Sequence, residues 1–264
     1  MSPAEKHTHG LLVLPDCDAL SRAAADEFTR RADAAVAAKG SFAVALSGGS
    51  TPKRLYELLA SEGEPCRARM PWGRTHFFFG DERHVPPEHA ESNYRMVRET
   101  LLTRAPVPPE NVHRVVAENP DAYAAADEYE RELRDFFHTR EGLQPRFDLI
   151  LLGLGEDGHT ASLFPGTAAL FEAERLFVAN WVEKLCAYRL TMTLPLINRA
   201  RAVVFLVSGD EKAEVLRAVL DTEACERDEP PYPAQLVRPT RGELLWLADE
   251  AAARLLRRTC GRLT

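Results

Sequence analysis

The chain has 264 residues, of which 45% are hydrophobic, and this is enough to bury one sizeable core. Its formal net charge of -7 argues against a general nucleic-acid binder, because neutralising a phosphate backbone needs a concentrated basic surface. A small anionic ligand remains compatible with this charge, since a single phosphate needs only a few local donors.

The five cysteines are odd in number and widely spaced, and none of them forms a CxxC pair. This pattern is typical of a reduced, cytoplasmic protein. No apolar run approaches the roughly 18 residues that span a bilayer, so we expect neither secretion nor membrane insertion. We expect residues 1–264 to form one domain, with residues 1–9 as a mobile tail.

Short runs rich in Val, Ile, Leu and Phe recur along the chain, and most of them precede a segment with helical periodicity. This alternation predicts a single-domain, doubly wound α/β fold with a mostly parallel sheet flanked by helices. In chain order we expect strand 11–14, helix 19–38, strand 42–46, helix 52–60, strand 76–79, helices 93–102 and 122–137, strands 148–152 and 202–207, helix 211–220, strand 244–247 and helix 249–257. The Pro-rich stretches 85–87, 106–109 and 230–233 are expected to be loops.

Ligands of open parallel sheets bind beyond the carboxyl ends of the strands, and the first unusual strand end reads SGGSTP. Its glycines, Gly48 and Gly49, let the backbone approach a ligand closely, while Ser50 or Thr51 can cap the helix that follows. Together with Ser47, these amides and hydroxyls would form a seat for a phosphate. An ordinary tight turn before a capped helix explains the residues equally well, and the spacing of a nucleotide P-loop is absent.

Charged residues gather in GDERHVP, directly after the apolar run FFF. Such a cluster is poorly suited to packing alone, and a strand end places it in the ligand crevice. Arg83 is the natural donor to an anion or a developing oxyanion, and Asp81 either acts as an acid or base or fixes Arg83 in a bidentate pair. A solvated, salt-bridged loop is the competing interpretation, and we adopt it for Glu82 and His84.

The segment GLGEDGHTASLFPG follows a further apolar run. It contains a GxGxxG match, but Pro165 comes too soon for the long helix that a dinucleotide loop needs. Asp157 and His159 lie two positions apart on this loop, so the carboxylate can orient the imidazole or a water in one cavity. An imidazole is well suited as a general base, although a lone loop histidine is more often structural.

The segment SGDEK follows strand 202–207 and places Lys212 in the first turn of a helix. The helix dipole repels a cation there, and a bound anion would explain its position. A surface lysine paired with a nearby acid explains it about as well. Arg189, on a further expected strand, can point into the same crevice. No His, Cys, Asp and Glu cluster has metal-ligand spacing, so we expect no metal and no cofactor.

Taken in order, these segments resemble the 6-phosphogluconolactonase family, which is related to the glucosamine-6-phosphate deaminases. The resemblance covers nearly all of the chain and rests on SGGSTP, GDERHVP with the downstream SNY, GLGEDGHTASLFPG, RLTMTLP, SGDEKA, and PAQLVRP followed by LWLAD. It implies a cytoplasmic enzyme that hydrolyses 6-phospho-D-glucono-1,5-lactone to 6-phospho-D-gluconate, the second step of the oxidative pentose phosphate pathway. We expect such an enzyme to be a monomer or a weak homodimer that binds neither nucleic acid nor membrane.

The resemblance implies that His159 is the catalytic base with Asp157 beside it, and that Arg83 lies at the reacting end of the sugar. We therefore predict the catalytic residues to be His159, Asp157, Arg83 and Asp81. The predicted substrate and phosphate contacts are Ser47, Gly48, Gly49, Ser50, Thr51, Arg189 and Lys212.

Three other functions fit parts of the pattern. An aminosugar-phosphate deaminase or isomerase would have a further acid, in a pattern like GHIAFNEP, where this chain reads GHTASLFPG. A non-catalytic sugar-phosphate sensor would keep the phosphate seat, but it would need a DNA-binding or partner module for which the chain has no spare length. A nucleotide-dependent oxidoreductase would need a long helix after Gly158 and an acidic contact to a ribose.

Overall fold

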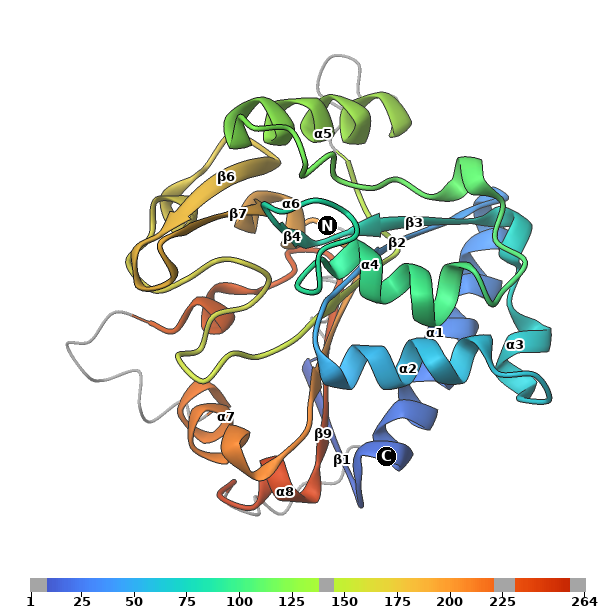
Figure 1. Cartoon of the computed structure of the whole chain (residues 1–264). Coiled ribbons are helices and arrows are strands. Elements are labelled where there is room, and N and C mark those ends of the chain that lie inside the picture. The colour runs from blue at the N-terminus through green and yellow to red at the C-terminus, as the bar shows by residue number, and fades with distance from the viewer. Residues whose placement is uncertain (1–8, 138–144, 221–230, 257–264) are drawn as a thin grey trace, which may run out of the picture.

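A six-stranded sheet, parallel in every pairing, forms the centre of the molecule (Figure 1). The computed structural model describes residues 9–137, 145–220 and 231–256. The strands in spatial order are β1 (His9–Leu14), β9 (Glu243–Asp249), β8 (Ala202–Val207), β5 (Leu149–Leu152), β2 (Phe42–Leu46) and β3 (Thr75–Phe79). Every residue of β2, β5 and β8 is buried, as strands covered on both faces require. The predicted mostly parallel sheet is confirmed.

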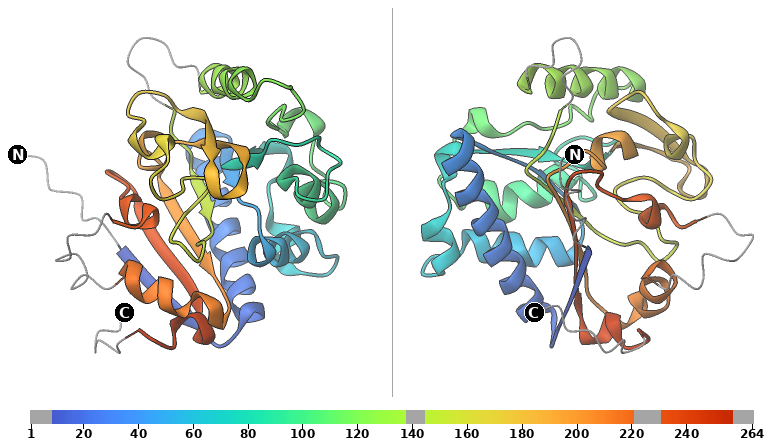
Figure 2. Two further views of the ribbon diagram at one scale, coloured as in Figure 1. Left: turned by 60° about the vertical axis from the view of Figure 1, so that its left-hand side comes forward. Right: turned by 180° about the vertical axis from the view of Figure 1, so that it is seen from behind.

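Helices cover both faces of this sheet, which confirms the flanked arrangement. Figure 2 shows α1 (Cys17–Lys39) and α2 (Ser50–Ala60) on one face and α7 (Ala213–Leu220) on the other. The remaining α-helices are α3 (Pro65–Arg69), α4 (Asn93–Val97), α5 (Ala122–Phe136), α6 (Leu194–Ile197) and α8 (Glu250–Ala253). Among the described helices, none combines the length and apolarity needed to cross a membrane.

A second, antiparallel sheet was not predicted. It consists of β4 (Asp81–Arg83), β7 (Ala187–Met192) and β6 (Phe177–Val182), and α5 packs against it. Of these strands, the sequence indicated only the one that carries Arg189. The Gly80 backbone connects the two sheets, because its N–H donates to Leu46 O and its carbonyl accepts from Met192 N, both at 2.9 Å.

Two predicted helices have nearly the expected extent but include turns of another type, and the last helix differs in its start. Expected helix 93–102 is α4 continued by a π-helical turn, Arg98–Leu102, and expected helix 211–220 begins with a 3-10 turn, Asp210–Lys212. Asp249 ends β9 and caps α8 by accepting from Ala252 N, so that helix starts later than expected. The expected tail of residues 1–9 lies outside the described residues except for His9, which begins β1. Residue 257, the expected end of the last helix, also lies outside them.

Two buried tyrosines hold the carboxyl ends of β2 and β3. The Tyr56 hydroxyl, from α2, donates to Ser47 O at 2.9 Å and accepts from Ser47 N at 3.0 Å. The Tyr129 hydroxyl, from α5, accepts from Phe79 N at 2.9 Å and donates to His113 O at 3.2 Å. Burial raises the pKa of both phenols, so both stay neutral and can donate. The strand ends that precede the candidate site are therefore tied to the surrounding helices.

A histidine pair lies beside the edge strand β3. His76 Nδ1 is 3.2 Å from His113 Nε2, and His113 Nδ1 is 2.8 Å from Glu132 Oε1. The His76 ring also packs against Phe136, with the ring centroids 4.8 Å apart. Burial, and then the neighbouring His113 and Lys39, lower the pKa of His76. The folded chain therefore favours the neutral form of this imidazole.

Replacing His76 with Gln should make the folded protein less sensitive to mild acid. Because the pKa of His76 is lower in the folded than in the unfolded chain, its contribution to stability is complete above about pH 6.5 and is lost as the pH falls. Gln keeps a donor toward His113 but does not titrate. The loss in free energy of unfolding between about pH 7.5 and 5.5, measured in urea, should be smaller in the variant.

His89→Gln is the matched control, since His89 is an exposed loop histidine, and it should lose as much stability as the wild type over the same pH step. Equal losses in His76→Gln and the wild type would contradict this account of the pair.

Candidate active site

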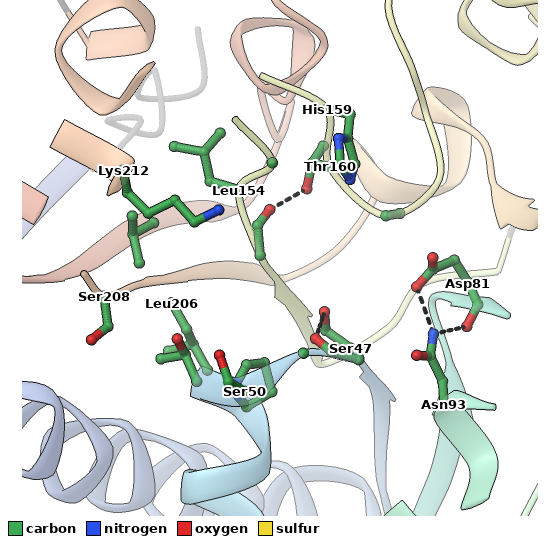
Figure 3. Close-up of a pocket in the computed structure, with 18 of the residues that line it drawn as sticks. Ser47, Ser50, Asp81, Asn93, Leu154, His159, Thr160, Leu206, Ser208 and Lys212 are labelled. Carbon is green, nitrogen blue, oxygen red and sulfur yellow. Dashed lines mark hydrogen bonds between the residues drawn. The ribbon is translucent and has the colours of Figure 1, made fainter. Parts of the chain in front are cut away.

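The carboxyl ends of β2, β5 and β8 open into a cavity of about 290 Å³ (Figure 3). All four segments singled out in the sequence contribute to its lining. The predicted residues that line it are Ser47, Gly48, Gly49, Ser50, Thr51, Asp81, Arg83, His159 and Lys212. Two predicted residues, Asp157 and Arg189, lie outside this lining.

The SGGSTP turn brings backbone close to the cavity. A Cβ on Gly48 would lie 1.9 Å from Asn93 Oδ1, and Gly49 has a φ of +106°, so side chains would be opposed at both positions. Gly49 is also the residue that precedes α2, and among the described residues no side chain caps this helix end. The expectation that Ser50 or Thr51 caps α2 was wrong, because both lie within its first turn. The first amides of α2 are therefore available to an anion.

Lys212 supplies a positive charge to the same part of the cavity. It ends the 3-10 turn before α7, and Figure 3 shows its amine pointing into the cavity from the side of Ser208. In the described ranges no carboxylate pairs with it, while its neighbour Asp210 pairs with Arg254. The interpretation of Lys212 as one half of a surface ion pair is therefore not supported.

His159 lines another wall of the cavity and is held on several sides. Its Nδ1 lies 2.5 Å from Asp157 Oδ1, and its ring stacks on Phe164 with the centroids 4.1 Å apart. A Cβ on Gly155 would lie 2.0 Å from His159 Nδ1, so the loop needs glycine there. Because Nδ1 is engaged with the carboxylate, Nε2 is the nitrogen free to exchange a proton with a ligand.

Asp157 is a charged support for the imidazole. Its second oxygen accepts a hydrogen bond from Lys184 Nζ. Partial burial alone would raise the pKa of Asp157, but the hydrogen bonds from Lys184 and then His159 more than offset this and lower it to about 2. Asp157 is therefore ionised near neutral pH, and it contacts His159 without lining the cavity.

Two guanidinium groups lie side by side where β4 meets β7. Arg83 and Arg189 are directly opposed in this antiparallel pair, and Arg83 donates to the Glu91 carbonyl. Burial, and then the charge of Arg83, lower the pKa of Arg189. Within the described part of the chain, neither forms an ion pair with a carboxylate. Arg189 thus lies beside Arg83 and not beside Lys212. The contact predicted between Arg189 and the substrate phosphate stays a prediction.

Of the two roles left open for Asp81, the bidentate pair with Arg83 was wrong. The Asp81 carboxylate is buried and accepts from Ser162 Oγ at 2.6 Å and from Asn93 Nδ2 at 3.2 Å. Asn93 lines the cavity, yet the sequence offered little signal for these contacts, because Ser162 lies 81 residues from Asp81. Neutral donors fix this carboxylate, and Arg83 keeps its charge for a ligand.

Glu82 and His84 support neighbouring segments, but the expected solvated, salt-bridged loop was wrong, because Glu82 lies buried in β4. Glu82 is buried and accepts from Asn93 N and Tyr94 N, both at 2.8 Å, which caps α4. His84 Nε2 lies 2.6 Å from the Asn119 carbonyl oxygen and is outside the cavity lining. Among the described residues, no group of three or more His, Cys, Asp or Glu side chains could hold a metal ion.

Comparison with known proteins places this geometry in a family. The family model described as glucosamine-6-phosphate isomerases/6-phosphogluconolactonase matches residues 15–246. The 6-phosphogluconolactonase of Synechocystis sp. is 47% identical over 87% of this chain and 90% of its own length. The human 6-phosphogluconolactonase is 40% identical over 92% of each chain.

A solved structure gives the same result. The structure of 6-phosphogluconolactonase from Trypanosoma cruzi matches with a TM-score of 0.79 and 32% identity, covering 96% of this chain and 98% of the other. Both the sequence and the fold agree over nearly the whole chain. The chain therefore belongs to the glucosamine-6-phosphate isomerase/6-phosphogluconolactonase family.

Proposed function

We propose that this chain is a 6-phosphogluconolactonase, which hydrolyses 6-phospho-D-glucono-1,5-lactone to 6-phospho-D-gluconate in the oxidative pentose phosphate pathway. Relatives that bear this name are up to 47% identical to it. The observation that carries the proposal is one cavity lined both by His159 and by an uncapped helix end with Lys212. A base and an anion seat in one cavity suit a substrate with a reactive carbonyl at one end and a phosphate at the other.

The phosphate would bind at the start of α2. Backbone amides of Ser50 and Thr51, the side chains of the SGGSTP turn and the Lys212 ammonium are donors of the type that recognises a phosphate dianion. Binding at this remote end would orient the lactone, so that its carbonyl carbon lies near His159.

A δ-lactone is an activated ester, and water can open it without a covalent intermediate. His159 Nε2 would take a proton from water while the water oxygen bonds to C1. Arg83 or loop amides near Gly155 would stabilise the resulting oxyanion. As the bond between C1 and the ring oxygen breaks, protonated His159 would return the proton to that oxygen. Atoms and charge balance with water as the only co-reactant.

The residues that follow His159 favour this reaction over aminosugar-phosphate deamination. Thr160 Oγ1 donates to Gly153 O at 2.9 Å, and Ser162 Oγ donates to Asp81. The additional acid that the deaminase pattern requires is absent from this segment. The direct test is pH-controlled hydrolysis of freshly generated lactone, with glucosamine 6-phosphate assayed alongside for ammonia. Acid release above the enzyme-free rate, without ammonia, is the expected result.

The proposal also covers the cellular compartment and the oligomeric state of the enzyme. We propose a cytoplasmic enzyme that acts as a monomer or a weak homodimer. The cysteines Cys17, Cys66 and Cys186 are free thiols, as a reducing compartment would maintain them.

Replacing His159 with Ala should lower kcat roughly 100-fold or more, because a positioned general base contributes about that much to a proton transfer. KM should change little, since the phosphate seat is intact. His84→Gln is the matched control, because His84 lies outside the cavity lining. Rates are corrected for spontaneous lactone opening. Wild-type turnover in His159→Ala would exclude His159 as the base.

Replacing Lys212 with Met should raise KM roughly 10-fold or more, because a hydrogen bond to a charged group contributes about 1.5–3 kcal/mol. The value of kcat should remain within about 3-fold, since the base is unchanged. Inorganic phosphate should inhibit the wild type competitively and the variant more weakly. Lys53→Met removes an exposed lysine outside the cavity and should match the wild type. An unchanged KM in Lys212→Met would remove this lysine from the phosphate seat.

A further inference from the structure

Lys184 forms the outer end of a chain of contacts that leads to the cavity. It lies in a 3-10 turn, Glu183–Leu185, between β6 and β7, and its Nζ binds Asp157 Oδ2. The other oxygen of that carboxylate holds His159 Nδ1 at 2.5 Å. The turn between β6 and β7 thus contributes a cation to the carboxylate and imidazole pair, although Lys184 itself does not line the cavity.

A second contact fixes the position of Lys184. Its Nζ lies 4.7 Å from the centroid of the Phe164 ring, the same ring on which His159 stacks. A cation near an aromatic face is attracted to the ring quadrupole. Phe164 is only 6% exposed, so its ring is held in place by packing and can position both Lys184 and His159. Lys184 and His159 therefore share two partners, the Asp157 carboxylate and the Phe164 ring.

The charge of Lys184 matters because Asp157 alone would favour the protonated form of His159. An ionised carboxylate on one imidazole nitrogen stabilises the imidazolium, and an imidazolium cannot take a proton from water. A cation on the opposite oxygen offsets this effect while leaving the orienting hydrogen bond in place. Since Lys184 is about half exposed, at 52%, solvent screens part of its influence.

We propose that Lys184 is a positioning residue for the reaction: it holds Asp157 in the orientation that fixes the His159 ring, and it neutralises the carboxylate so that the ring is available as a base near neutral pH. This inference rests on the lactonase function proposed above. Lys184 acts through Asp157 and touches no substrate.

Other charged groups also surround His159. They are Arg83, Lys212, Asp81 and Glu211 on the cavity lining, Glu156 beside Asp157, and Glu183 beside Lys184. Glu183 is engaged elsewhere, because its Oε2 accepts from Trp181 Nε1 at 2.7 Å. The wild type and Lys184→Met share all of these groups, so a difference between their pH profiles reports the loss of the Lys184 charge.

The test compares Lys184→Met with Lys184→Arg and with Leu185→Ala, a change to a half-exposed residue of the same turn. In Lys184→Met, the acid limb of the kcat/KM profile should move to higher pH by roughly half to one pH unit. At pH values on the acid limb, kcat/KM of Lys184→Met should be up to about 10-fold lower than that of the wild type, while KM stays within about 2-fold. Lys184→Arg should largely restore the wild-type profile, and Leu185→Ala should keep it. Asp157, with a pKa of about 2, does not titrate in the assay range.

A second readout is independent of turnover. The NMR titration of the His159 ring, assigned by comparison with His159→Gln, should move to higher pH in Lys184→Met and stay in place in Leu185→Ala. An unmoved acid limb together with an unmoved titration would overturn the inference, as would a loss of activity that arises from KM alone. A wild-type enzyme without lactonase activity would instead contradict the proposed function, while the NMR comparison would still test the role of Lys184.

Discussion

The hydrogen bonds of the Gly80 backbone determine where the site can form. Its amide continues the parallel sheet to Leu46, and its carbonyl starts the antiparallel sheet at Met192. The chain therefore passes from β3 into β4 without leaving hydrogen-bonded structure, which fixes Asp81 and Arg83 over the carboxyl end of β2. The glycine turn after β2 and the charged strand after Gly80 become two walls of one cavity.

The carboxylates and the cations around the cavity have different kinds of partner. Neutral donors satisfy the buried carboxylates around the cavity: Ser162 and Asn93 bind Asp81, and backbone amides bind Glu82. In the part of the chain that the structure describes, Arg83, Arg189 and Lys212 have no carboxylate partner. A chain with a net charge of -7 thus presents unneutralised cations at the site, and such charges favour an anionic ligand.

The sequence was informative where contacts are local and less so where they are distant. Continuous apolar runs predicted all six parallel strands, and in the central strands burial on both faces requires such runs, while the edge strand β1 keeps Leu11, Leu12 and Val13 exposed. By contrast, β4 is the polar tripeptide DER, and only its pairing with β7 makes it a strand. Likewise, residues at a strand end could be identified as candidate ligands, but Lys184 lies 27 residues from Asp157 in a turn with no motif of its own. The partner of each site residue depends on tertiary packing.

The hydroxyl groups of Thr160, Ser162 and Ser47 bear on the choice between direct attack by water and a covalent intermediate. A nucleophilic serine or threonine needs its proton directed at the base. Here Thr160 Oγ1 donates to Gly153 O, Ser162 Oγ donates to Asp81, and Ser47 Oγ donates to Gly48 O. Each of these hydroxyls uses its proton in supporting the loops. In the proposed reaction the free Nε2 of His159 would therefore act on a water molecule, since an activated ester such as a lactone needs no stronger nucleophile.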